Sequence, residues 1–172
     1  MLKPWVWMCS AVALTSAAPL SAELNVPIAA RVVSFLQPPP SGTMAAAILF
    51  EPGNAASEEE ASAIERAVGG SLAAGRSAIR ARRVPIGAMG ALSSYRVAFV
   101  TAGLRAEQGA IAVAAAKSSV LTISSDAACV QAARCVVGIS TVPKTQIIVS
   151  KAAARASNIR FGSAFLMLVK EI

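Results

Sequence analysis

Few side chains in this sequence are of the types that carry out acid–base or metal chemistry. The 172 residues include no histidine, so the commonest general base and the commonest metal ligand are both missing. Asp126 follows a β-branched run, a position that suits a catalytic acid, but we favour its interpretation as the N-cap of a helix. Neither Gly69 and Gly70 nor Gly87 and Gly90 form the pattern of a phosphate-binding loop. We therefore expect no catalytic residue, no metal site and no cofactor, and we do not expect an enzyme.

Three consecutive glutamates, Glu58 to Glu60, could mark either a metal site or the start of a helix. Ser57 followed three residues later by Glu60 has the form of a capping box. The acidic side chains also suit the positive end of a helix dipole. We favour capping, because it explains why the glutamates stand where a helical pattern begins.

Cys129 and Cys135 are the cysteines left once an N-terminal leader containing Cys9 is set aside. An even number of cysteines in an exported chain indicates a disulfide. Five residues separate the pair, whereas a redox CxxC motif has two, and two cysteines without histidine are too few ligands for zinc. We predict a disulfide between them.

Residues 76–86 alternate apolar and basic side chains, as a half-exposed strand does. Arg80 and Arg82 would share one face, with Arg76 and Arg83 beside them. This could be a solvated strand face or a surface for an acidic partner. No aromatic side chain is interleaved to stack on bases, so we expect no nucleic-acid binding and favour the solvated face. Arg80, Arg82 and Arg83 remain the candidate partner-binding basic face.

Residues 1–22 have the layout of a secretory signal peptide. Lys3 precedes an apolar run at residues 5–14, and small residues stand before Glu23. The apolar run is too short to cross a bilayer, although an uncleaved anchor is the alternative. We expect cleavage after Ala22 and a periplasmic domain at residues 23–172 that does not insert directly into the membrane. Because Lys3 is the only charged residue of the leader, 15 basic and 9 acidic residues remain.

Apolar runs alternate with helical patterns along the rest of the chain, with Asp126 and Ser150 as N-caps and Asn158 suited to a left-handed helix end. The predicted helices are 26–36, 57–74, 104–116, 127–134, 151–157 and 159–172, the last anchored by Phe161, Phe165, Leu166, Leu168 and Val169; the predicted strands are 43–50, 76–86, 96–101, 120–124, 135–139 and 146–150. This order predicts a single three-layer, Rossmann-like α/β domain. Its sheet is mostly parallel, with an antiparallel C-terminal edge and closing helices.

A ligand of such a domain is expected at the carboxyl ends of the parallel strands. Those ends fall at residues 51–54, 101–103 and 124–126. The candidate ligand pocket is therefore formed by Thr101, Ser124, Ser125 and Asp126. This expectation rests on the fold alone.

Two C-terminal segments resemble the YfiR-like (YfiR/HmsC-like) family of exported regulators. They are VLTISSD at residues 120–126 and IIVSKAAARASNIRFGSAFLMLVK at residues 147–170. The first predicted helix and the arginine-rich strand also fall where the family has equivalents. The chain departs from the family pattern at Gln37-Pro38, where an aromatic-Pro pair is common, and it lacks the glycine pair after Asp126.

The resemblance implies a periplasmic homodimer that binds and represses the periplasmic sensor domain of an inner-membrane diguanylate cyclase. Such a repressor controls cyclic di-GMP signalling and biofilm formation. The bridge between Cys129 and Cys135 would then be a stabilising or a redox-sensitive element. The alternative is a periplasmic small-molecule-binding or transport-associated module that uses the strand ends as its pocket.

Overall fold

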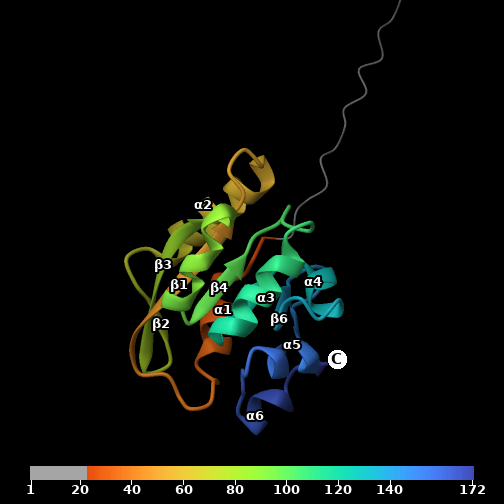
Figure 1. The fold of residues 1–172 in the computed structure, drawn as a ribbon. Helices are drawn as coiled ribbons and strands as arrows, with labels where there is room; N and C mark the ends of the chain where they lie inside the picture. The colour runs from red at the N-terminus through yellow and green to blue at the C-terminus, as the bar shows by residue number, and fades with distance from the viewer. Residues whose placement is uncertain (1–22) are drawn as a thin grey trace, which may run out of the picture.

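Eight strands form one sheet in the computed structural model, which describes residues 23–172 (Figure 1). The strands are β1 (Gly42–Phe50), β2 (Leu72–Ala74), β3 (Ser77–Pro85), β4 (Val97–Val100), β5 (Leu121–Ser124), β6 (Val137–Ser140), β7 (Gln146–Val149) and β8 (Lys170–Glu171). Their order across the sheet is β2-β3-β1-β4-β5-β6-β7-β8. The five strands from β3 to β6 are parallel, while β2 and β7 run antiparallel to β3 and β6. The predicted signal peptide lies outside the described residues.

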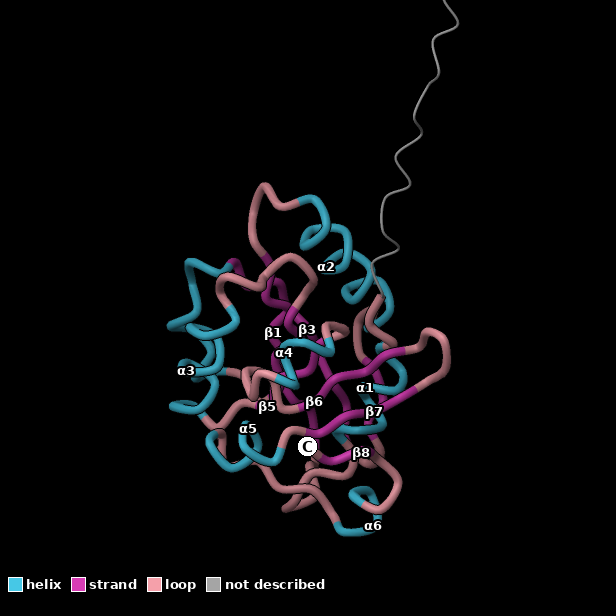
Figure 2. The backbone as a smooth tube through the Cα atoms, turned by 90° about the vertical axis from the view of Figure 1, so that its right-hand side faces the viewer, coloured by secondary structure: helices cyan, strands magenta, loops and turns pink. Residues whose placement is uncertain are grey.

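Helices cover both faces of this sheet, which gives the predicted three layers (Figures 1 and 2). The helices are α1 (Val26–Val33), α2 (Ala55–Val68), the 3₁₀ helix η1 (Ile86–Ser94), α3 (Gln108–Ser118), α4 (Ala127–Gln131), α5 (Lys151–Ala156) and α6 (Ser163–Leu166). Apolar side chains of α1 and α2 share one core cluster with one face of the sheet. Those of η1, α3 and α4 share a second cluster with the other face. The predicted α/β architecture is therefore confirmed.

The central strands are continuous apolar runs because both of their faces are covered. All four residues of β4 and all four of β5 are buried. Along β1, Ala46 and Ile48 belong to the cluster on the α1–α2 side, whereas Ala47 and Leu49 belong to the opposite cluster. This is the pattern expected of a parallel sheet inside an α/β domain.

Helix α2 differs from its prediction at both ends. Its N-cap is Asn54, whose side chain accepts a hydrogen bond from the Ser57 amide, so the capping box of Ser57 and Glu60 is wrong. The side chains of Ser57 and Glu60 point into the fold and bond to distant partners instead. The helix ends at Gly69, which has a positive φ of 57°, and the strand β2 follows where we expected more helix.

The shorter helices begin where their caps predict, although α4 ends at Gln131 and not at Arg134 as expected. The Asp126 side chain accepts from the Ala128 amide at the start of α4, and the Ser150 side chain accepts from the Ala153 amide at the start of α5. Asn158 has a φ of 53°, the left-handed conformation expected beyond a helix C-terminus. Local sequence is sufficient at these positions because each cap bonds within three residues of itself.

The predicted final helix over residues 159–172 is wrong. Only the short α6 is helical there, and β8 then pairs in parallel with β7. The Ile172 amide also donates a hydrogen bond to the Val149 carbonyl, which extends this pairing. Phe161 and Phe165 do anchor the segment, with ring centroids 5.1 Å apart, whereas Leu168 is 80% exposed. A non-local strand pairing has overridden an apolar spacing that also suits a helix.

Candidate functional site

The four residues of the predicted pocket lie together at the carboxyl edge of the sheet, but their polar groups serve the fold. The Thr101 hydroxyl donates to the Leu49 carbonyl at 2.8 Å, so the contact of 2.7 Å with Ser57 must be a hydrogen bond donated by the Ser57 hydroxyl. Ser124 donates to the Val100 carbonyl at 2.9 Å. Thr101, Ser124 and Ser125 are buried, so none of the three presents a free polar group to solvent.

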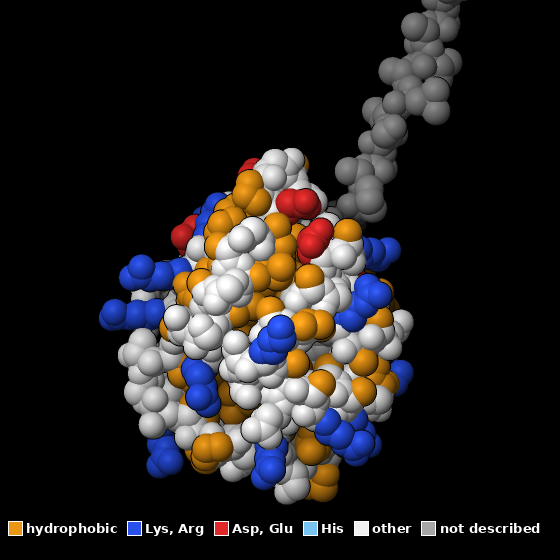
Figure 3. Space-filling view, in the orientation of Figure 1, with side chains coloured by type: hydrophobic (Ala, Val, Ile, Leu, Met, Phe, Trp, Pro, Cys, Tyr) orange, Lys and Arg blue, Asp and Glu red, His pale blue; other side chains and the backbone are white. Residues whose placement is uncertain are grey.

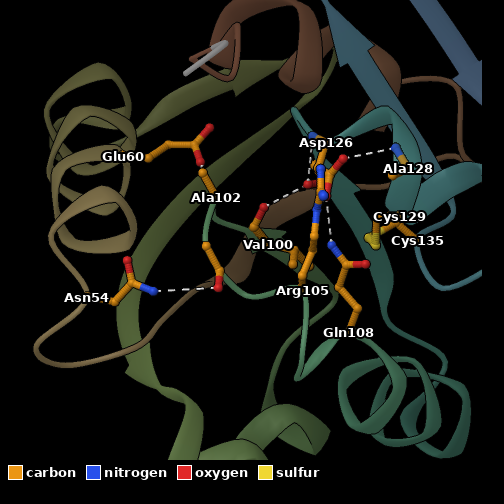
Figure 4. A network of polar contacts seen from close by, with 12 residues as sticks. Asn54, Glu60, Val100, Ala102, Arg105, Gln108, Asp126, Ala128, Cys129 and Cys135 are labelled. Atoms are coloured by element: carbon orange, nitrogen blue, oxygen red, sulfur yellow. Dashed lines mark hydrogen bonds and ion pairs between the residues drawn. A yellow bond between two sulfur atoms is a disulfide. The ribbon is translucent and has the colours of Figure 1, made fainter. Parts of the chain in front are cut away.

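Glu60, for which the sequence suggested only a capping role, accepts hydrogen bonds from three residues at this edge, and Figure 4 shows it beside one of them, Ala102. Its side chain extends from α2 to the ends of β4 and β5. One carboxylate oxygen accepts from the Leu24 amide at 3.0 Å and from the Ser125 hydroxyl at 2.8 Å. The other accepts from the Ala102 amide. One carboxylate therefore joins the N-terminal segment, a helix and two strand ends.

Burial raises the pKa of the Glu60 carboxyl, because removal from water disfavours the charged form. The hydrogen bonds from Ala102, Ser125 and Leu24 favour the carboxylate and oppose this effect. A sequence signal for the burial does exist. Glu60 falls on the same helical stripe as Ser57, Ala61 and Ile64, all of which are buried.

A second group of contacts surrounds Asp126 at the same edge. Its Oδ1 accepts from the Ala128 amide at 2.9 Å, and its Oδ2 accepts from the Gln108 side-chain amide at 3.0 Å. Arg105 Nε lies 3.5 Å from Oδ2, although the arginine side chain is 79% exposed. Since the carboxylate is already bonded on both oxygens, Asp126 caps α4 and holds α3 beside it (Figure 4).

The buried polar side chains at the carboxyl edge of the sheet therefore bond to one another and to the backbone, and they stabilise the fold. Within residues 23–172 no buried side-chain nitrogen or oxygen lacks a hydrogen-bond partner. The same residues contain no group of three or more histidine, cysteine or acidic side chains placed to hold a metal ion. The buried hydroxyl and carboxylate groups of this edge are therefore all engaged in hydrogen bonds.

Cys129 and Cys135 form the predicted disulfide, with Cα atoms 5.2 Å apart. Both cysteines are fully buried, and they lie in the core cluster between α4 and the sheet. Gly138 of β6 allows this close packing, because a Cβ at that position would lie 2.7 Å from a methyl carbon of Val130. The bridge therefore fastens α4 and the start of β6 to the core.

The candidate basic face is divided between the two sides of β3. Arg83 Nε pairs with Glu65 of α2 at 2.8 Å, and its guanidinium lies over the Phe50 ring. Successive strand residues point to opposite faces, so Arg80 and Arg82 project from the other side of the strand, where both are exposed. The three arginines are therefore not one surface. The alternation of side chains along a strand already predicts that Arg83, which directly follows Arg82, points to the face opposite Arg80 and Arg82.

An open cavity lies at the opposite end of the sheet, where the parallel strands begin. Its volume is about 990 Å³. Its walls come from the loop after α1, the first residues of β1, the residues just before β4 and β5, and the turn after α5. It is lined by Leu36, Gln37, Pro38, Pro39, Pro40, Ser41, Thr43, Met44, Ala45, Ser94, Arg96, Ser119, Asn158, Ile159 and Arg160. Sequence reasoning missed it, because its walls come from four separate segments.

Charge is unevenly distributed over the described surface. In Figure 3 acidic side chains gather at the top of the molecule, where α2 begins, and basic ones occupy the rest of that face. Three ion pairs are formed within residues 23–172, by Arg83, Arg105 and Lys151. The remaining arginines and lysines of that region have no carboxylate within ion-pair distance.

None of the helices in residues 23–172 is both long enough and apolar enough to cross a membrane. No protein-family model matches the sequence, and no curated protein is significantly similar to it.

Solved structures that share the fold include the following three. A conserved domain protein from Vibrio cholerae has a TM-score of 0.60 at 13% identity, with 86% of this chain and 60% of that chain covered. An ABC domain from Streptococcus pneumonia, solved in complex with L-Trp, has a TM-score of 0.59 at 11% identity, with coverages of 85% and 61%. A substrate binding protein with adhesive properties from Clostridium difficile, in a ligand-free, open structure, has a TM-score of 0.57 at 12% identity, with coverages of 85% and 68%.

At these identities the likeness concerns the fold alone. The chain has an α/β fold shared with proteins described as binding substrates or L-Trp, and it spans about three fifths of the length of the first two.

Proposed function

We propose that this protein is an exported ligand-binding module that holds a small molecule in the cavity at the amino ends of its parallel strands. The observation that carries the proposal is the cavity itself. Its volume of about 990 Å³ lies at the upper end of the range of roughly 300–1,000 Å³ for small-molecule sites. The fold shared with a domain solved in complex with L-Trp and with a protein described as a substrate binding protein supports the same class of function.

The composition of the cavity walls suits a small polar ligand. Three prolines, Met44 and Ile159 give apolar surface, while hydroxyl and amide side chains offer hydrogen bonds. Such a mixture buries the body of a ligand and fixes its orientation. The carboxyl edge offers no comparable set, since its polar side chains already bond to one another.

Filling the cavity should abolish binding without unfolding the protein. Ala45 is exposed on β1 and lines the cavity, so Ala45→Trp places an indole in the ligand space. A small-molecule library screened by ¹H–¹⁵N NMR should contain ligands that shift the amide signals of Thr43, Ser119 and Asn158. We expect at least a tenfold loss of affinity for those ligands in Ala45→Trp.

Ala73→Trp provides the matched control, because Ala73 is also an exposed strand alanine but does not line the cavity. It should bind the same ligands with unchanged affinity. Ligands that shift Ser125 and Asp126 instead, and that tolerate Ala45→Trp, would place the site at the carboxyl edge and contradict the proposal.

A second candidate function is regulation of a membrane signalling protein, as the family resemblance implies. The observation that favours it is an exposed apolar pair beside the last strand of the sheet. Met167 and Leu168 are 81% and 80% exposed. Contiguous exposed apolar patches on a protein surface can mark a contact with another protein, and these two side chains are neighbours in sequence.

If that surface binds a diguanylate cyclase, Met167→Glu should reduce its capture in periplasmic crosslinking at least fivefold and should raise cyclic di-GMP in cells. Val113→Glu is the control, since Val113 is another exposed apolar residue and lies on α3. Unchanged cyclic di-GMP after deletion of the gene, together with no captured cyclase, would rule this function out.

A further inference from the structure

We propose that the ligand of the amino-edge cavity is an anion, a small molecule bearing a carboxylate or phosphate group that Arg96 and Arg160 bind. The inference rests on the proposed function, because it concerns the same cavity. Two arginines line that cavity, and no aspartate or glutamate does. An uncompensated pair of guanidinium groups around one hollow attracts and orients an oxyanion.

Neither arginine has a carboxylate within ion-pair distance among the described residues. This separates them from Arg83 and Arg105, which pair with Glu65 and Asp126. The five N–H donors of each guanidinium group are therefore not used in an ion pair. Because neither guanidinium is paired with a carboxylate among the described residues, a bound anion need not displace one, and both arginines are exposed to solvent.

The backbones of both arginines are hydrogen-bonded to neighbouring segments. The Arg96 amide donates to the Ala45 carbonyl at 3.0 Å, and its carbonyl accepts from the Leu121 amide at 3.0 Å. Arg96 is thus fixed between β1 and β5. The Arg160 carbonyl accepts from the Gln37 amide at 2.9 Å, which fastens it to the proline loop. Binding then requires ordering of the side chains only, which reduces its entropic cost.

The surrounding side chains complete a site for an oxyanion with an apolar body. Ser41, Thr43, Ser94 and Ser119 supply hydroxyl donors in the same cavity. Pro38, Pro39 and Pro40 supply a wall with no free backbone N–H, against which an apolar group can lie. The acidic residues gathered at the opposite end of the molecule leave this end the more positive (Figure 3).

The test uses three probes with ¹H–¹⁵N NMR and calorimetry on the whole protein: pyrophosphate, citrate and the uncharged sugar ribose. Pyrophosphate or citrate should shift the amides of Thr43, Ser119 and Arg160, and the stronger of the two identifies the phosphate or the carboxylate class. Affinity should fall at least tenfold in Arg96→Gln and in Arg160→Gln. Arg134→Gln removes the same charge from an exposed position outside the cavity and should change affinity less than twofold.

The outcomes separate this inference from the proposed function. If Arg134→Gln weakens anion binding as much as Arg96→Gln does, the anions respond to net charge and the inference fails. If ribose or an uncharged library compound binds in the cavity while both anions do not, the inference fails and the ligand-binding function stands. If neither charged nor uncharged molecules shift the cavity amides, both fail.

Discussion

Replacement of Glu60 by alanine is expected to lower the free energy of unfolding by about 3–5 kcal/mol. The substitution leaves the amides of Leu24 and Ala102 and the hydroxyl of Ser125 without their acceptor. Each hydrogen bond to a charged group contributes about 1.5–3 kcal/mol, and buried donors without a partner are costly. Urea denaturation followed by circular dichroism measures the loss.

Glu59→Ala is the matched control, since it removes the adjacent glutamate from an exposed position on the same helix. Its effect should stay within about 0.5 kcal/mol, as is usual for surface substitutions. Equal effects of Glu59→Ala and Glu60→Ala would show that helix charge, and not the buried network, determines the stability.

The pH dependence of stability tests the same residue independently. The pKa of Glu60 is raised in the folded state, so the folded protein binds this proton more tightly than the unfolded chain does. The stabilisation that this tighter proton binding adds to the folded protein is complete below the ordinary glutamate pKa, and it is lost as pH rises through the raised pKa of the folded state. Glu60→Gln cannot titrate, so the advantage of the wild type over this variant should shrink as pH rises through that window. A constant or growing difference would contradict the raised pKa.

Removal of the disulfide should cost about 2–3 kcal/mol, because a loop this short constrains the unfolded chain only modestly. The variant that carries both Cys129→Ala and Cys135→Ala measures this in urea without reductant. Wild type unfolded in dithiothreitol should move toward the same midpoint. A variant as stable as the wild type would show that the bridge adds nothing to the fold.

The accessibility of the bridge decides whether it can sense redox conditions. Both cysteines are fully buried in the core, so a reductant can reach the sulfur atoms only when α4 opens. We expect the native bridge to survive dithiothreitol for as long as the protein stays folded, as thiol labelling and mass spectrometry would show. Rapid reduction in the folded state would instead favour the redox-sensitive role that the family resemblance implies.

The elements that local sequence predicts well are those whose partners are close in sequence. Asp126 and Ser150 cap their helices through amides two or three residues away. The buried strands are recognisable because covering by helices on both faces makes them continuously apolar. The disulfide could be predicted from the even number of cysteines and the predicted export, without any knowledge of distances.

Features that depend on distant partners could not be predicted in this way. The side chain of Glu60 bonds to residues 36, 42 and 65 positions away, so its neighbours in sequence suggest only a cap. The cavity is assembled from residues as far apart as Leu36 and Arg160. The rule that ligands bind at the carboxyl ends of parallel strands predicts a site at the edge of the sheet opposite the cavity. The β8 pairing likewise depends on a partner about 20 residues away.

The strand order also has a consequence for how the molecule assembles. Strand β4 is added beside β1, and from β5 to β8 each strand is added beside its immediate predecessor in sequence, at an edge that is still free. A chain that emerges N-terminus first can thus extend this side of the sheet outward from β1, without opening strand pairs already made. Glu60 belongs to α2, which precedes β4 and β5 in the sequence, yet it accepts hydrogen bonds from Ala102 and Ser125, which follow those two strands. Its carboxylate therefore remains solvated until β4 and β5 have joined the sheet.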